Sequence, residues 1–113
     1  MTHPRELNDD EMIEVAKHQE EKNYFSDSEA FYKLYNTAKG AVFYFENGED
    51  DKVLTCLFEM EMENLYIVGE PKGATKFQFE LQPLTNCHRV LKPIVEGDGT
   101  GIQMRFEFKL DEI

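Results

Sequence analysis

The chain has 113 residues, enough for one two-layer core but too few for two independent domains. Its 23 acidic and 12 basic residues give a formal net charge of -11 and a pI near 4.6. Such a surface repels nucleic-acid phosphates and anionic membranes, so nucleic-acid binding is not expected. No stretch approaches the ~20 consecutive apolar residues of a membrane span.

The lack of targeting signals in residues 1–6 and the position of the two cysteines lead us to expect a reducing compartment. Residues 1–6 contain neither an apolar leader for secretion nor a glycine at position 2 for myristoylation. Cys56 and Cys87 both lie in strand-like patterns, where a free cysteine acts as a small buried hydrophobe. We therefore expect two unpaired thiols and a cytoplasmic protein.

Residues 1–40 are predicted to form a helical, acidic N-terminal extension, in front of a β-sandwich at residues 41–113 within one structural domain. Asn8 with Glu11 three positions later is typical of a capping box, and Leu7 and Met12 have the spacing of a hydrophobic staple. This pattern predicts a helix from about residue 9 to residue 22.

The apolar stripe of this helix consists mainly of Met12, Val15 and Ala16. A stripe this narrow cannot stabilise an isolated helix of that length. We expect the helix either to pack along its own sandwich or to insert into a groove of a partner protein. The three residues are therefore candidate partner-binding residues.

Residues 30–38 have two interpretations. A capping signal at residues 26–29 and an apolar face at residues 30–35 favour a short second helix. However, Phe31, Lys33 and Tyr35 also alternate with Tyr32 and Leu34, and aromatic residues favour strands. The sequence leaves both interpretations open.

From residue 41 onward, apolar and polar residues alternate in the manner of strands with one buried face. Turn signals separate six expected strands, at residues 41–46, 53–62, 65–68, 75–81, 87–92 and 102–110. The predicted fold is mainly β, an antiparallel β-sandwich of about six to eight strands with one or two N-terminal helices. The side chains expected between its sheets include Phe58, Phe79, Phe106 and Phe108.

No pair of residues suited to catalysis emerges. A nucleophile needs a base within hydrogen-bond reach, and the only imidazoles are those of His3, His18 and His88. Cys87 and His88 are neighbours in one strand, so their side chains point to opposite faces. Cys56 belongs to the apolar face, where burial makes a thiol inert. We expect no enzymatic activity, no catalytic residue and no organic cofactor.

Two acidic loops are the candidate metal site. Glu49, Asp50 and Asp51 lie in one inter-strand loop, and Glu96 and Asp98 lie in another. Calcium takes six to eight oxygen ligands, so the two loops could hold it if they share an end of the sandwich. Solvated turns are the commoner use of such residues. A calcium-responsive module is the alternative function.

Three segments carry a family resemblance, at residues 57–69 (LFEMEMENLYIVG), 77–83 (FQFELQP) and 90–92 (VLK). Through them, residues 53–110 resemble the non-catalytic β-sandwich accessory domain of calpain-related proteins from protists. The resemblance implies a fold similar to lipid- and calcium-binding sandwiches that packs against other domains through acidic loops. The catalytic cysteine, histidine and asparagine motifs of the protease are absent.

The leading hypothesis is a small intracellular protein–protein interaction or structural module. With the resemblance, this becomes a non-enzymatic adaptor associated with the cytoskeleton. A protein partner is expected, but no feature of the sequence identifies that partner or the oligomeric state.

Overall fold

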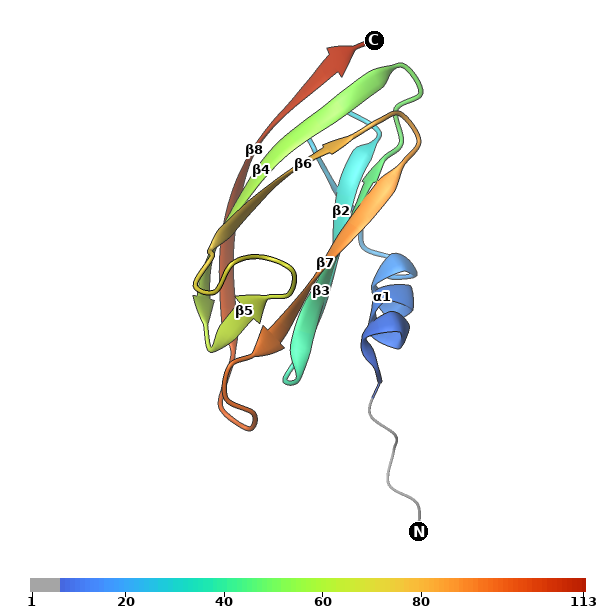
Figure 1. Ribbon diagram of the computed structural model, residues 1–113. Coiled ribbons are helices and arrows are strands. Elements are labelled where there is room, and N and C mark those ends of the chain that lie inside the picture. Colours follow the sequence, from blue (N-terminus) through green and yellow to red (C-terminus); the bar gives the residue numbers. More distant parts are fainter. Residues whose placement is uncertain (1–6) are drawn as a thin grey trace.

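The computed structural model describes residues 7–113; residues 1–6, with His3 and the start of the expected extension, lie outside the described residues. In residues 7–113, two antiparallel sheets pack face to face, and one helix lies against the outer face of the larger sheet (Figure 1). The predicted mainly β fold, an antiparallel sandwich of about six to eight strands, is confirmed, because residues 7–113 contain eight strands in two sheets.

Each sheet joins strands that are distant in the sequence. The larger sheet has the order β1-β2-β3-β7-β5, and the smaller sheet has the order β6-β4-β8. Their bounds are β1 (Asn23–Tyr24), β2 (Ala30–Thr37), β3 (Gly40–Asn47), β4 (Lys52–Glu63), β5 (Leu65–Ile67), β6 (Lys76–Leu81), β7 (Asn86–Pro93) and β8 (Gly101–Glu112). The helix α1 spans Asp9–Lys17.

Helix α1 begins where the capping box predicts. Asn8 Oδ1 accepts a hydrogen bond from the Glu11 amide at 2.9 Å, and Glu11 Oε1 accepts one from the Asn8 amide. The helix ends at Lys17, five residues before the expected position, because the apolar stripe stops at Ala16. Lys33 Nζ then donates to the Lys17 carbonyl oxygen at 2.7 Å. With nine residues, α1 is too short to cross a membrane, and residues 7–113 contain no other helix that could.

Residues 30–37 form strand β2, so the helical interpretation of this segment is wrong. Tyr32 and Leu34 point into the sandwich, whereas Phe31 and Tyr35 point outward beneath α1. Pairing with β1 and β3 satisfies the backbone on both sides. The expected helical extension over residues 1–40 is corrected accordingly, because β1 and β2 belong to the larger sheet.

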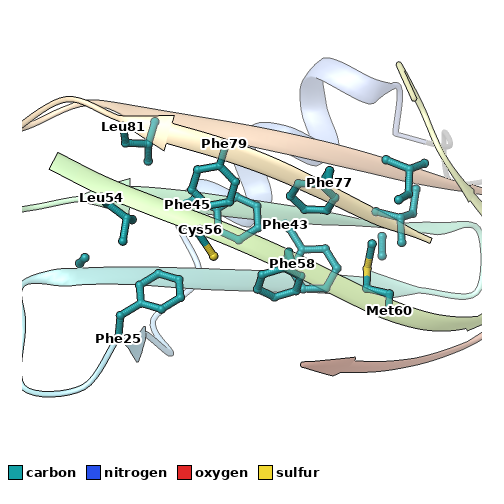
Figure 2. Close-up of a cluster of buried hydrophobic side chains, with 14 of the residues drawn as sticks. Phe25, Phe43, Phe45, Leu54, Cys56, Phe58, Met60, Phe77, Phe79 and Leu81 are labelled. Atoms are coloured by element: carbon teal, nitrogen blue, oxygen red, sulfur yellow. The ribbon is translucent and has the colours of Figure 1, made fainter. Parts of the chain in front are cut away.

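The main core fills the space between the sheets with aromatic rings (Figure 2). Phe58 of β4 is fully buried, and its ring centroid lies 5.2 Å from those of both Phe43 and Phe45 of β3. Phe79 is also buried, as expected. Every second residue of β4 from Leu54 to Met60 contributes to this core, which is the physical basis of the alternation in the sequence.

Phe106 and Phe108 are only partly buried, contrary to the expectation for them. They lie on β8, which forms one edge of the smaller sheet and, among the described strands, pairs with β4 alone. Phe25, in the connection after β1, packs against both rings with centroid distances of 5.1 and 5.2 Å. The position of β8 at an edge therefore limits the burial of its apolar face.

Replacing Phe58 by alanine should lower the free energy of unfolding by about 3–5 kcal/mol, because it removes a whole ring from a fully enclosed site. Phe106→Ala should cost clearly less, since solvent already reaches that ring. Urea denaturation of the two variants with unchanged m-values measures both losses. An equal or larger loss for Phe106→Ala would contradict the assignment of β8 to an edge.

Candidate functional site

The two thiols are in no state to act as nucleophiles at neutral pH. Burial, with a smaller contribution from the nearby Cys87, raises the pKa of the Cys56 thiol to about 12. Burial also raises the pKa of Cys87. Cys87 packs against the main core, whereas its neighbour His88 is exposed, as strand geometry predicts. These groups therefore form no thiolate–imidazole pair.

The two acidic loops lie at opposite ends of the sandwich. The end of β3 pairs with the start of β7, as the register Glu46↔Asn86 records, so these antiparallel strands end on opposite sides. Residues 48–51 follow β3, and residues 94–100 follow β7 (Figure 1). The expected calcium site that joins Glu49, Asp50 and Asp51 with Glu96 and Asp98 is therefore wrong. Within residues 7–113, no three His, Cys, Asp or Glu side chains gather to hold a metal ion.

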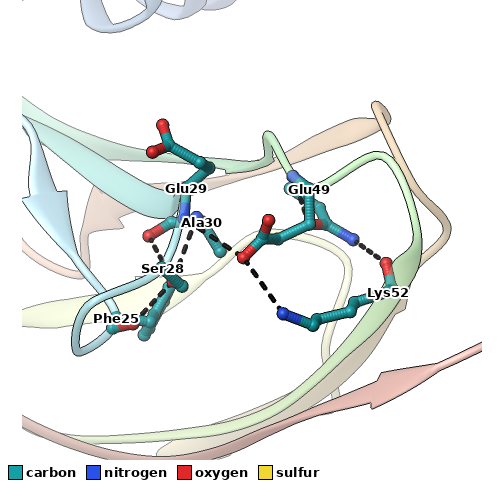
Figure 3. A network of polar contacts seen from close by, with 7 residues as sticks. Phe25, Ser28, Glu29, Ala30, Glu49 and Lys52 are labelled. Carbon is teal, nitrogen blue, oxygen red and sulfur yellow. Dashed lines mark hydrogen bonds and ion pairs between the residues drawn. The ribbon is translucent and has the colours of Figure 1, made fainter.

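The loop after β3 has a structural role instead (Figure 3). Glu49 Oε1 lies 3.8 Å from Lys52 Nζ and accepts a hydrogen bond from the Glu29 amide at 3.5 Å. Asn47 is fully buried, and its Nδ2 donates to the carbonyl oxygens of Lys52 and Leu81 at 2.8 and 3.0 Å. Asn47 thus joins the larger sheet to two strands of the smaller one.

Two of the three candidate partner-binding residues of α1, Met12 and Ala16, face its own sheet. Met12 and Ala16 are buried in a second cluster with side chains from β2, β3 and β7, whereas Val15 is only partly covered. Lys33 secures this packing, because its Nζ lies 5.7 and 5.8 Å from the ring centroids of Phe31 and Tyr44 while it binds the helix end. Of the two expected uses of the helix, packing along its own sandwich is the one present.

A groove lies beside α1 on the outer face of the larger sheet. It has a volume of about 520 Å³ and extends from α1 across β7 to β5. Met12, Val90 and Leu91 form its buried part, and Leu7 and Tyr66 are exposed at its rim. We call this feature the α1–β5 groove.

Charged residues also line the α1–β5 groove. Asp9 Oδ2 of α1 and Lys92 Nζ of β7 form an ion pair at 3.0 Å. A hydrogen bond to Asp9 is the main cause that raises the pKa of Lys92. The lining of the groove is therefore partly apolar and partly charged.

Further exposed apolar side chains surround this end of the sheet. Tyr66, Val68, Ile94 and Val95 are 42, 38, 65 and 51 % exposed. Asn64, with a φ of 57°, joins the two segments that carry them: its Nδ2 donates to the Val95 carbonyl oxygen and its Oδ1 accepts from the Val95 amide, both at 2.8 Å. Neighbouring exposed apolar side chains that are held in place mark interaction sites.

The sequence did not reveal this surface. In the sequence, residues 63–64 appear only as a turn signal, and Ile94 and Val95 belong to no periodic pattern. The exposed side chains come together because β5 and β7 pair, with Leu65 opposite Pro93. No local pattern in the sequence encodes that pairing.

No protein-family model, curated protein or solved structure matches this chain. The resemblance to calpain accessory domains therefore stays a prediction.

Cys56 should resist alkylation in the folded protein. At pH 8 an ordinary thiol with a pKa near 8.5 is partly ionised, whereas Cys56, with a pKa of about 12, stays protonated and enclosed. In a Cys87→Ser variant we expect iodoacetamide to label Cys56 at least about 100-fold more slowly than in the urea-unfolded chain, as measured by mass spectrometry. Similar rates in both states would contradict its burial.

Millimolar calcium should leave the thermal midpoint unchanged, because a ligand stabilises the native state only when it binds there. The carboxylate of Glu49 is already engaged by Lys52, and the second acidic loop is at the far end. The control is the double variant Asp50→Asn with Asp51→Asn, which removes charge without changing size. A rise of several degrees that this variant abolishes would restore a calcium site on the first loop alone.

Proposed function

We propose that this protein is a non-enzymatic protein–protein interaction module in which the α1–β5 groove receives an apolar side chain from a segment of a protein partner. The observation that carries the proposal is a groove with a buried apolar part, beside exposed apolar side chains on two segments that Asn64 joins. The sandwich acts as the rigid scaffold, and the partner segment covers the exposed rim.

The chemistry of the rim favours a protein over a small apolar ligand. Tyr66 offers a large apolar ring with a hydroxyl at its end, a combination enriched in protein interfaces. The Asp9–Lys92 pair offers a carboxylate and an ammonium to the backbone or polar side chains of a bound segment. An apolar anchor beside polar groups is the usual anatomy of a protein-binding site.

The state of the two thiols argues against a cysteine-dependent enzyme. A catalytic cysteine requires a lowered pKa in an accessible position, and burial raises the pKa of both thiols here. Helix α1 then serves as one wall of the site and not as the element that a partner takes up. The further proposal of an adaptor in the cytoplasm, associated with the cytoskeleton, requires that the partner is a cytoskeletal protein.

A photo-crosslinking amino acid at position 66 should test this proposal. Tyr24, on the opposite edge of the same sheet, is the matched control because it is 47 % exposed against 42 % for Tyr66. In extract of the native cell we expect a discrete adduct from position 66 and none from position 24. The variant Tyr66→Ser with Ile94→Asp should retain at least about tenfold less of the crosslinked partner. Equal adducts at both positions, or full retention by a variant with an unchanged thermal midpoint, would contradict the proposal.

A further inference from the structure

Strand β8 leaves one long edge of the smaller sheet open. It pairs with β4 at twelve successive positions, from Lys52↔Glu112 to Glu63↔Gly101, without a bulge. No strand in the described part of the chain pairs with its other side. An edge of this kind offers a row of backbone donors and acceptors to another strand.

The hydrogen-bond pattern identifies which residues face this open edge. Ile113 donates its amide to the Asp51 carbonyl oxygen at 3.2 Å, so the odd-numbered residues of β8 bond to β4. Consistently, the even-numbered Met60 of β4 donates to Thr75, on the side of β6. The backbone groups of the even-numbered residues of β8, such as Phe106 and Phe108, therefore point outward.

The other edges of the two sheets are short or interrupted. Strands β1 and β5 have two and three residues, and β6 has six residues and ends shortly before Pro83. In contrast, β8 has twelve residues, contains no proline and directs apolar side chains inward. Phe106 and Phe108 are only partly buried, whereas Phe58 and Cys56 opposite them on β4 are fully buried. A further strand beside β8 would cover these rings.

The polar face of β8 is complementary to itself. Its charged residues alternate in sign along the strand, in the order Arg105, Glu107, Lys109 and Asp111. If two copies of β8 pair antiparallel about an axis through Phe108, Arg105 faces Asp111 and Glu107 faces Lys109. Each pair occurs twice by symmetry, and opposite charges in directly opposed positions stabilise a sheet.

Neighbouring registers lose this complementarity. If the axis lies at Glu107, Arg105 faces Lys109 and Glu107 faces its own copy. If the axis lies at Lys109, Glu107 faces Asp111. An axis at Phe106 keeps only the two Arg105–Glu107 pairs, and an axis at Leu110 keeps only the two Lys109–Asp111 pairs, half as many as the axis at Phe108. The charge pattern therefore selects the register centred on Phe108, because like charges in opposed positions are destabilising.

We propose that the open edge of β8 binds a second copy of the chain, with β8 pairing antiparallel to β8 about a two-fold axis at Phe108. The smaller sheets then join into one sheet with the order β6-β4-β8-β8-β4-β6. The interface differs from the α1–β5 groove, which lies on the outer face of the larger sheet. Self-association and partner binding are therefore separable.

Charge reversal at Glu107 tests the interface directly. Glu107 lies opposite Leu57 on β4, so Glu107→Lys breaks no cross-strand ion pair within the chain. Analytical ultracentrifugation at physiological salt should show a concentration-dependent dimer for the unmodified protein. Glu107→Lys should weaken this dimer at least about tenfold, and the added change Lys109→Glu should restore it to within about threefold.

The control is Glu80→Lys, on the far edge strand of the same sheet. Both single changes make the net charge less negative by the same amount. If only the overall repulsion between the acidic chains mattered, both variants would dimerise more strongly. We expect weakening only for Glu107→Lys. A monomeric unmodified protein at about 100 μM, a dimer unaffected by Glu107→Lys, or no recovery with Lys109→Glu would each overturn the proposal.

Amide hydrogen exchange provides a second measurement that does not depend on any variant. As the protein concentration rises, the outward-facing amides of Met104, Phe106, Phe108 and Leu110 should become protected. Those of Arg105 and Glu107 bond to β4 and should be protected at every concentration. A dimer that forms without new protection of the even-numbered amides would place the interface elsewhere and overturn the proposal.

Discussion

The packing of aromatic rings between two sheets is the constraint on which the rest of this structure depends. Phe58 lies at the centre, in contact with rings from the opposite sheet, and is fully enclosed. A domain of this size is stabilised by only a small margin, so a core of close-packed rings supplies a large part of it. Helix α1, the acidic loop and the α1–β5 groove are positioned by strands that this core holds in place.

Distance from that centre explains how each strand is used. On β4 the inward residues have neighbours on both sides and are closed to solvent, whereas on β8 they have a strand on one side only. The same sequence pattern therefore gives full burial on one strand and a partly exposed apolar face on the next. Exposed apolar faces and open edges are where association between proteins takes place.

Polar side chains hold the remaining parts in place at specific points. Asn47 joins the two sheets from a buried position, and Asn64 ties the segment after β7 to β5. Lys33 binds the last carbonyl of α1 and so holds the helix against the larger sheet. Each contact links segments distant in the sequence, and those of Lys33 and Asn64 hold elements next to the α1–β5 groove in place. The two proposed interaction surfaces lie on different sheets, so one chain can use both.

Local periodicity and capping were sufficient to predict the sandwich, most of its strands and the start of α1 directly after Asn8, because strand pleat and helix caps depend on near neighbours. The local pattern could not decide whether the segment around Phe31 is a helix or a strand. It forms strand β2 because it pairs with β3, which lies outside that segment. Nor could it show that the acidic loops lie at opposite ends, or that Phe106 lies on an edge strand. The α1–β5 groove and the open edge of β8 follow from strand order, and strand order depends on contacts between residues far apart in the chain.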